Sequence, residues 1–350
     1  MLPRERFEAA FERAPVDRPP IMYQHLGAAR TVLNAAGLTM REGFHDPEKF
    51  AKICIMAQRI TGFDNVMAGW GDILVEARAH GTKWRWPEKD YYPRSDGYAI
   101  SSLAELDKVQ PVDPMKDEFW SVPLRAAGLM QERHGDEVAV VGCINGPMMM
   151  SGEVMGYENL LMSTWSEPDL ALQLMDRMLE SSAMYGEHLG KMGIGHVFIE
   201  DGTCSPDVNS IEGLERFDLG CLSKLMSSFR SNGLRSIVHN CAANPYLDGY
   251  TRMEIEALHL TPKTGDRRTI YDMFRQRTTV IGGIDQTFLL FKGTPEQVRK
   301  EVQAMISDWG DGPGFMIAPG CEMAFKTPIE NIIALREGSV KNVKDIGNDG

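Results

Sequence analysis

The stretch 235-RSIVHNCAANP-245 places an apolar, β-branched pair, Ile237-Val238, just before His239, Cys241 and a proline. A short apolar run that ends at a polar turn is typical of a buried strand. Runs of this kind recur along the chain, and longer stretches with helical periodicity separate them. The sequence therefore predicts a fold in which strands alternate with helices.

Strands are predicted at 20–23, 65–68, 138–143, 196–200, 235–239, 256–260, 279–283 and 315–318. Two of the helices predicted between them cover 168–193 and 294–310, and the second opens with Thr-Pro-Glu-Gln, which suits an N-cap followed by a first-turn proline. Eight strands that alternate with helices predict a (β/α)8 TIM barrel, and a doubly wound sheet is the alternative.

The composition indicates a globular enzyme. We expect the 350 residues to form one barrel domain, 1–350, with an N-terminal helical extension. The formal net charge of −12 argues against nucleic acid as a partner, because binding to phosphates needs clustered Lys and Arg. No apolar signal region opens the chain and no run approaches the ~20 residues of a membrane helix, so we expect a cytoplasmic protein without a membrane partner. Its six cysteines should then be thiols.

Candidate metal ligands follow two of the predicted strands. In a barrel the carboxyl ends of all strands face one mouth, so His239 and Cys241 could meet Cys321 there. Imidazole and thiolate are the ligands that zinc prefers, and three protein ligands with an open fourth position are typical of catalytic zinc. The alternative is a buried histidine beside two core thiols, and spacing alone leaves both interpretations open.

The residues around these ligands resemble a known family. His-x-Cys, followed at a distance by Cys within 316-MIAPGCEMAFKTPIENIIAL-335, is similar to the zinc motif of corrinoid-dependent methyltransferases of the uroporphyrinogen decarboxylase superfamily. Shorter similarities occur at 4-RERFEAAFERAPVDRPPI-21, 145-NGPMMM-150 and 205-SPDVNS-210, so the resemblance spans nearly the whole chain. The family fold is a (β/α)8 barrel, which agrees with the alternation of predicted strands and helices.

This resemblance implies a zinc methyltransferase with His239, Cys241 and Cys321 as Zn²⁺ ligands. The metal would lower the pKa of a substrate thiol, and the thiolate would take a methyl group from a methylcobamide held by a partner corrinoid protein. Transfer in the other direction, from a methoxy or methylthio compound, is the first alternative. The thiol-using members usually have glycine after the first cysteine, whereas this chain has Ala242-Ala243, and Glu322 follows the second. The small methyl donor or acceptor therefore stays open.

Further site residues are expected at the barrel mouth. Glu200 ends the strand 196–200 and is expected to act near the metal as a ligand, a base or a partner of His239. Asp72 in 71-GDIL-74 resembles the catalytic aspartate segment of uroporphyrinogen decarboxylase, which implies contact with substrate or corrinoid. The side chains expected to line the cofactor pocket are Asn145, Met148, Tyr157 and Asp285.

Two other functions are disfavoured. Uroporphyrinogen decarboxylase uses an Arg-rich N-terminal loop and no metal, whereas 22-MYQHLGAAR-30 contains the single arginine Arg30 and the zinc-type ligands are present. A degenerate barrel that only binds a tetrapyrrole or a partner protein would not need an intact ligand set.

Overall fold

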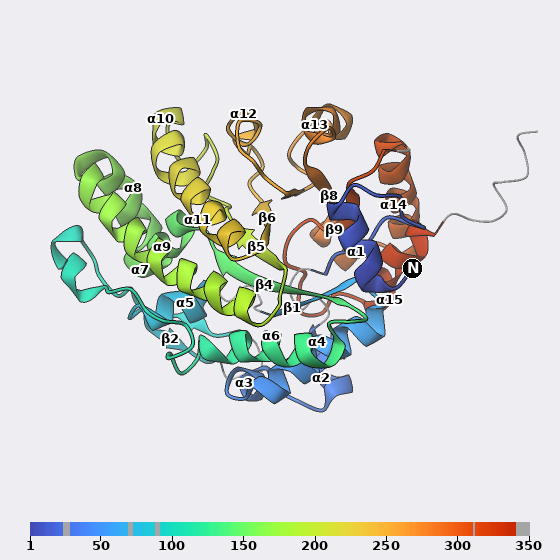
Figure 1. Ribbon diagram of the computed structural model, residues 1–350, viewed down its shortest axis with the longest axis horizontal. Helices are drawn as coiled ribbons and strands as arrows, with labels where there is room; N and C mark the ends of the chain where they lie inside the picture. The colour runs from blue at the N-terminus through green and yellow to red at the C-terminus, as the bar shows by residue number, and fades with distance from the viewer. Residues whose placement is uncertain (24–28, 69–72, 88–91, 311, 341–350) are drawn as a thin grey trace, which may run out of the picture.

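The computed structural model describes residues 1–23, 29–68, 73–87, 92–310 and 312–340. Seven parallel strands form one curled sheet in the order β1-β4-β5-β6-β7-β8-β9 (Figure 1). The strand order follows the chain without the reversal that a doubly wound sheet would show, which confirms the predicted barrel class. The strands are β1 (Asn65–Ala68), β4 (Ala139–Asn145), β5 (His196–Glu200), β6 (Arg235–Asn240), β7 (Ala257–Leu260), β8 (Thr279–Ile284) and β9 (Phe315–Pro319).

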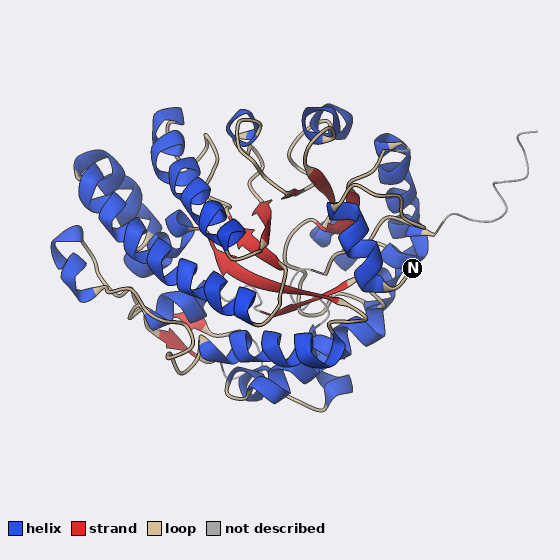
Figure 2. Ribbon diagram, in the orientation of Figure 1, coloured by secondary structure: helices blue, strands red, loops and turns tan. Residues whose placement is uncertain are grey.

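Helices surround this sheet on its outer face (Figure 2). The α-helices are α1 (Pro3–Phe11), α2 (Ala29–Ala36), α3 (Met40–Phe44), α4 (Pro47–Thr61), α5 (Ile73–Ala79), α6 (Ser121–His134), α7 (Pro147–Met155), α8 (Tyr157–Ser166), α9 (Pro168–Lys191), α10 (Ile211–Gly213), α11 (Gly220–Ser231), α12 (Leu247–Tyr250), α13 (Arg267–Phe274), α14 (Pro295–Trp309) and α15 (Ile329–Ser339). Shorter 3₁₀ and π segments are η1 (Leu103–Lys108), η2 (Leu214–Leu219) and η3 (Gln286–Phe291). Within the described ranges, none of the helices combines the length and apolar character needed to cross a bilayer.

The predicted first strand, 20–23, is present as an isolated bridge rather than a strand. Ile21 pairs in parallel with Ile317 of β9. On the β1 side, the side chain of Asn65 accepts a hydrogen bond from the backbone N of Tyr23 at 2.5 Å and donates one to its carbonyl at 3.0 Å. The Asn65 side chain and one backbone hydrogen bond, from Asp64 N to the Ile21 carbonyl at 3.0 Å, thus take the place of a regular ladder and close the barrel between β9 and β1.

The other seven predicted strands each overlap an observed strand. Four of these run one or two residues further at the carboxyl end than predicted: β4, β6, β8 and β9. Asn145 and Asn240 are therefore the last residues of strands, which brings both side chains to the rim of the barrel. The antiparallel pair β2 (Trp84–Arg85) and β3 (Arg94–Ser95) was not predicted, since two-residue strands carry no readable alternation.

Local sequence explains where the predicted long helices begin. Thr294 accepts a hydrogen bond from the backbone N of Gln297, and the Gln297 side chain accepts one from the backbone N of Thr294. This capping box starts α14 next to Pro295, as the Thr-Pro-Glu-Gln motif predicts. The helix predicted at 168–193 is α9, which also starts with a proline.

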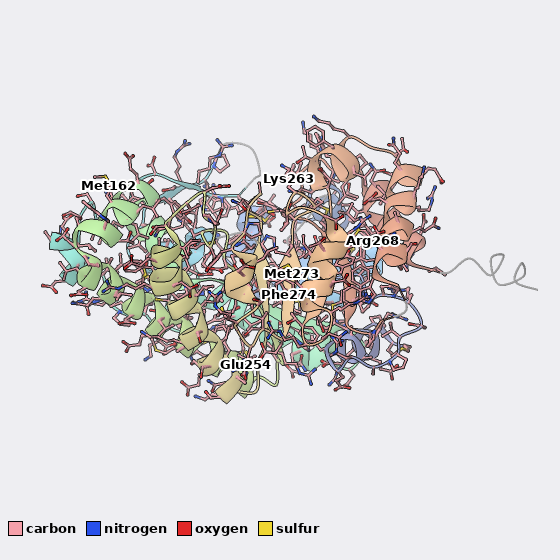
Figure 3. All side chains as sticks on the ribbon, turned by 90° about the horizontal axis from the view of Figure 1, so that it is seen from above. Met162, Glu254, Lys263, Arg268, Met273 and Phe274 are labelled. Atoms are coloured by element: carbon pink, nitrogen blue, oxygen red, sulfur yellow. The ribbon has the colours of Figure 1, made fainter. Side chains whose placement is uncertain are left out.

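The two ends of the barrel differ. At the amino end, Phe7 and Ala10 of α1 pack in one buried cluster with lumen residues such as Val141 and Phe198. At the carboxyl end, long connections follow the strands, including α7 and α8 after β4. Figure 3 shows Met162 of α8 and Arg268 of α13 on opposite sides of the molecule. Since α1 fills the amino end, the carboxyl end is where a ligand can enter.

Candidate metal centre

A row of polar side chains crosses the carboxyl ends of β4 to β7. Asn145 pairs in register with Glu200, Glu200 with His239, and His239 with His259. Residues paired in register point to the same face of a sheet. Residues two positions earlier in β5, β6 and β7 lie in the buried lumen cluster: Phe198, Ile237 and Ala257. The row therefore faces the lumen and forms its upper layer.

The three candidate ligands meet beside this row. One ligand atom each from His239, Cys241 and Cys321 lies within 4.8 Å of the other two. Zinc bound at about 2.0–2.3 Å from each ligand atom would hold those atoms on the order of 4 Å apart. The donor set and its spacing thus fit one tetrahedral zinc ion, with the predicted open position left for a substrate atom.

The two thiols differ in pKa. The hydrogen bond that Cys321 donates to Cys241 lowers the pKa of Cys241, and the neighbouring His239 lowers it as well. Burial opposes both effects, and the resulting pKa is about 5. The same bond raises the pKa of Cys321, because loss of its proton would place two negative charges side by side. A dication between the sulfurs would relieve that repulsion and favour two thiolates.

The ring of His239 is packed between two other rings, and within the part of the chain that the structure describes its two nitrogens lack ordinary hydrogen-bond partners. Its ring lies against Phe198 and His259, with centroid distances of 5.2 Å and 4.6 Å. Burial lowers the pKa of His239, but Glu200 and Cys241 outweigh burial and raise it. Among the described residues, neither ring nitrogen makes a hydrogen bond of ordinary length and angle, although the residue is 0% exposed. A bound metal would satisfy one of these nitrogens.

Glu200 lies next to the three candidate ligands rather than among them. Its Oε2 is 3.7 Å from Nε2 of His239. Of the described residues, only His239, Cys241 and Cys321 form the group with ligand atoms within 4.8 Å. Glu200 can therefore act on His239 or on a group at the open position without being an equivalent ligand.

The other predicted residues do not all lie at this centre. Tyr157 lies on its side: burial raises the pKa of the phenol, and the charges of Glu153, Glu200 and Cys241 raise it further. Asp285 caps η3 by accepting from the backbone N of Thr287 and Phe288. Asp72 lies outside the described residues.

A methionine that the sequence did not single out reaches the centre. Met148 packs in the main hydrophobic core, whereas Sδ of its neighbour Met149 accepts a hydrogen bond from the backbone N of Gly202 at 3.0 Å. A Cβ on Gly202 would lie 3.3 Å from Sγ of Cys241 and 3.7 Å from Sδ of Met149. The glycine thus lets the loop after β5 pack directly against a candidate ligand.

Glu76 is a second buried carboxyl that the sequence did not single out. It accepts hydrogen bonds from the backbone N and from Nδ2 of Asn145, both at 3.1 Å. Burial raises the pKa of Glu76 to about 8, Asn145 opposes that rise, and Glu200 adds to it. Glu76 lies in a helix, where its sequence pattern was that of an ordinary acidic residue in the first turn.

Fold and ligand set together define a barrel enzyme with a candidate zinc site at its carboxyl mouth. The sequence model of the family described as Uroporphyrinogen decarboxylase (URO-D) matches residues 2–341. The chain belongs to the uroporphyrinogen decarboxylase family.

Two relatives with known names show which kinds of enzyme the chain is similar to. The chain is 26% identical over 341 residues to the methylcobamide:CoM methyltransferase MtaA of Methanosarcina barkeri, covering 95% of this chain and 96% of that protein. It is 25% identical over 348 residues to a uroporphyrinogen decarboxylase of Anaeromyxobacter dehalogenans, covering 94% and 96%. The first of these supports the predicted enzyme class, methyltransferase.

A solved structure supports the fold. A methyltransferase from Methanosarcina mazei is similar with a TM-score of 0.87 at 23% identity, covering 97% of this chain and 98% of the other. This likeness confirms a barrel of the uroporphyrinogen decarboxylase type.

Proposed function

We propose that the chain is a zinc-dependent methyltransferase that moves a methyl group between a corrinoid protein and a small thiol or methylated compound. The convergence of His239, Cys241 and Cys321 within 4.8 Å at the barrel mouth supports this most directly. Similarity over 95% of the chain to a methylcobamide:CoM methyltransferase supports a corrinoid as the other methyl carrier. We also propose that residues 1–350 form one cytoplasmic barrel domain with α1 as its N-terminal extension.

The residues of the chain would divide the work. His239, Cys241 and Cys321 would hold Zn²⁺, and its positive charge would favour the thiolate form of a substrate thiol. Phe198 and His259 keep the imidazole in one orientation. The carboxylate of Glu200 would take the proton of the incoming thiol or orient the imidazole of His239, which its 3.7 Å separation from Nε2 supports.

The remaining predicted residues would serve the pocket. Asn145 and Tyr157 line the side of the mouth next to Glu200, and Met148 supports the neighbouring Met149 from the core. Asp285 and Asp72 stay predictions for the corrinoid side of the pocket.

The direction of transfer and the small substrate distinguish two forms of this function. In one, a thiol accepts a methyl group from the methylcobamide of the partner protein. In the other, a methoxy or methylthio compound donates its methyl group to the reduced corrinoid. Ala242-Ala243 next to Cys241 differs from the glycine usual in thiol-using members, so both directions need to be assayed.

Decarboxylation of a porphyrinogen is the second candidate, because a uroporphyrinogen decarboxylase is 25% identical over 94% of the chain. A cluster of one imidazole and two thiols has no part in a reaction that needs no metal. We therefore rank methyl transfer first.

Metal content and a corrinoid assay test the proposal together. Protein purified without chelators should contain about one zinc per chain, and Cys321→Ala should lose it while the fold is retained. Cys221→Ala is a matched control, because this buried thiol lies in α11 beside Sδ of Met175.

A corrinoid assay would then reveal the direction of methyl transfer. Conversion of methylcobalamin to cob(I)alamin by added thiols indicates a thiol acceptor, and methylation of cob(I)alamin by methoxy or methylthio compounds indicates a methyl donor. Native protein without metal would overturn the zinc site, and zinc-loaded protein inert in both assays would overturn methyl transfer.

A further inference from the structure

The loops after β5 and β6 are joined to each other beside the candidate metal ligands. The first carries Gly202 and the second carries Cys241. The hydrogen bonds that join these loops and strand ends include Asp201 N to the His239 carbonyl at 2.8 Å, Tyr246 N to the Cys204 carbonyl at 3.0 Å, and Ser205 Oγ to the Asn244 carbonyl at 2.6 Å. The backbone on either side of Cys241 is therefore tied to its neighbour.

Asn240 fixes the turn between two candidate ligands, His239 and Cys241. Its Oδ1 accepts a hydrogen bond from the backbone N of Ala242 at 2.9 Å, which bends the chain around Cys241. Its Nδ2 donates to the carbonyl of Cys204 at 2.9 Å and to the hydroxyl of Tyr250, also at 2.9 Å. Both ends of the amide are thus used to hold the turn.

Tyr250 links this amide to a buried carboxyl. Its hydroxyl donates to Oδ2 of Asp201 at 2.5 Å. Because a tyrosine hydroxyl has one proton, its oxygen is then left to accept from Asn240, which orients the amide with Oδ1 toward Ala242. Asp201 is 2% exposed, Tyr250 1% and Asn240 0%, so water does not compete for these bonds.

The loop that follows Asp201 is held by a second buried hydrogen bond. Two residues further on, Oγ1 of Thr203 donates to Oδ1 of Asp218 in η2 at 2.7 Å. Between them lies Gly202, whose added Cβ would be 3.3 Å from Sγ of Cys241. A shift of Asp201 would therefore move Gly202, which lies beside the sulfur.

We propose that Asp201, Tyr250 and Asn240 form a buried clamp that positions Cys241 for the metal. This inference rests on the proposed zinc site and adds positioning residues to it. His239 lies within β6 and its ring packs against Phe198 and His259, whereas Cys241 lies in the loop after β6 and its sulfur needs another source of order. A ligand held in place before the metal arrives loses less freedom on binding, and loss of such supporting contacts typically weakens metal affinity by about 10–100-fold.

Tyr250→Phe tests the clamp, because it removes both hydrogen bonds of the hydroxyl and leaves the ring. We expect zinc affinity, measured by competition with a chromophoric chelator, to fall by about 10–100-fold. The visible absorption of the Co²⁺-loaded protein should also change, since it reports the geometry of the thiolate ligands.

Tyr185→Phe is the matched control. This tyrosine is 1% exposed, and its hydroxyl accepts a hydrogen bond from the backbone N of Cys143 at 3.1 Å, away from the loops after β5 and β6. It should lose stability without losing zinc affinity or changing the Co²⁺ spectrum.

Two variants of Asp201 give a second test that does not depend on Tyr250→Phe: Asp201→Ala and Asp201→Asn. The alanine should weaken zinc binding as Tyr250→Phe does, and the asparagine should restore it, because an amide oxygen can accept the same hydrogen bond. Native-like zinc affinity in both Tyr250→Phe and Asp201→Ala would overturn the clamp while leaving the zinc site standing. A native protein that binds no zinc would instead overturn the proposed function.

Discussion

Glu200 and His239 occupy paired positions on β5 and β6, and Oε2 of the acid lies 3.7 Å from Nε2 of the imidazole. A carboxylate at this distance can influence both the ligand and whatever occupies the open position of a metal. Among the described residues, Glu200 is outside the close group of ligand atoms. Replacing it should therefore lower the methyl-transfer rate without changing the zinc content.

Glu200→Gln is expected to lower the methyl-transfer rate by about 100-fold, a typical loss for a residue that handles a proton. Zinc content should stay at the native value, because the three ligands are unchanged. Rates and metal content would be measured on the same preparation, with Glu12→Gln at the opposite end of the barrel as control. Loss of zinc from Glu200→Gln would show instead that the acid is a fourth ligand.

Gly202→Ala should weaken zinc binding more than it weakens the fold. The new Cβ would lie 3.3 Å from Sγ of Cys241, so the sulfur must move by a few tenths of an ångström. We expect about a tenfold loss of zinc affinity and a change in the free energy of unfolding below about 1 kcal/mol.

Gly195→Ala is the control for this substitution, because nothing lies within 4 Å of its added Cβ. Chelator competition and thermal unfolding on both variants separate the two effects. Equal zinc affinity in the two alanine variants would mean that the loop has room to adjust.

The candidate ligands could be predicted from the sequence because barrel geometry converts a distant sequence relation into a spatial one. His239 lies near the carboxyl end of β6, Cys241 follows that strand and Cys321 follows β9, and parallel strands in a barrel end at one mouth. The apolar runs also predicted seven of the eight strand positions. The eighth predicted strand, 20–23, is only an isolated bridge, and the side chain of Asn65 holds it on the β1 side. Hydrophobic periodicity cannot predict that a side chain takes over part of the backbone pairing.

The supporting residues of the site could not be predicted in the same way. Glu76 comes from a helix, and Tyr250 comes from the four-residue helix α12, so neither carries a strand-end signal. Met149 and Met148 are adjacent and chemically identical. Only the orientation of α7 decides that the first reaches Gly202 while the second packs in the core.

Glu76 should make stability depend on pH. Burial raises its pKa from 4.5 in the unfolded chain to about 8 in the folded protein. Between these values the folded state holds a proton that the unfolded chain has lost, so stability falls as pH rises and levels off above about 8. The slope from this residue is at most about 1.4 kcal/mol per pH unit.

Glu76→Gln removes that dependence, so its stability relative to the native protein should rise between pH 5 and pH 8. Denaturant unfolding at several pH values would measure the difference. Glu48→Gln should show no such gain, because Arg133 lowers the pKa of the exposed Glu48. A flat difference for Glu76→Gln would mean that Glu76 is already ionised at pH 5.

Cys241 should be alkylated more readily than Cys221 once the metal is removed. Its pKa of about 5 makes it a thiolate at neutral pH, whereas burial raises the pKa of Cys221 to about 12. The thiolate is the nucleophile, so iodoacetamide at pH 7 should modify Cys241 and spare Cys221 in the folded apoprotein. Added Zn²⁺ should protect Cys241, and peptide mass spectrometry would follow both sites. Equal labelling with and without Zn²⁺ would contradict Cys241 as a metal ligand, since a sulfur bound to zinc is withheld from the reagent.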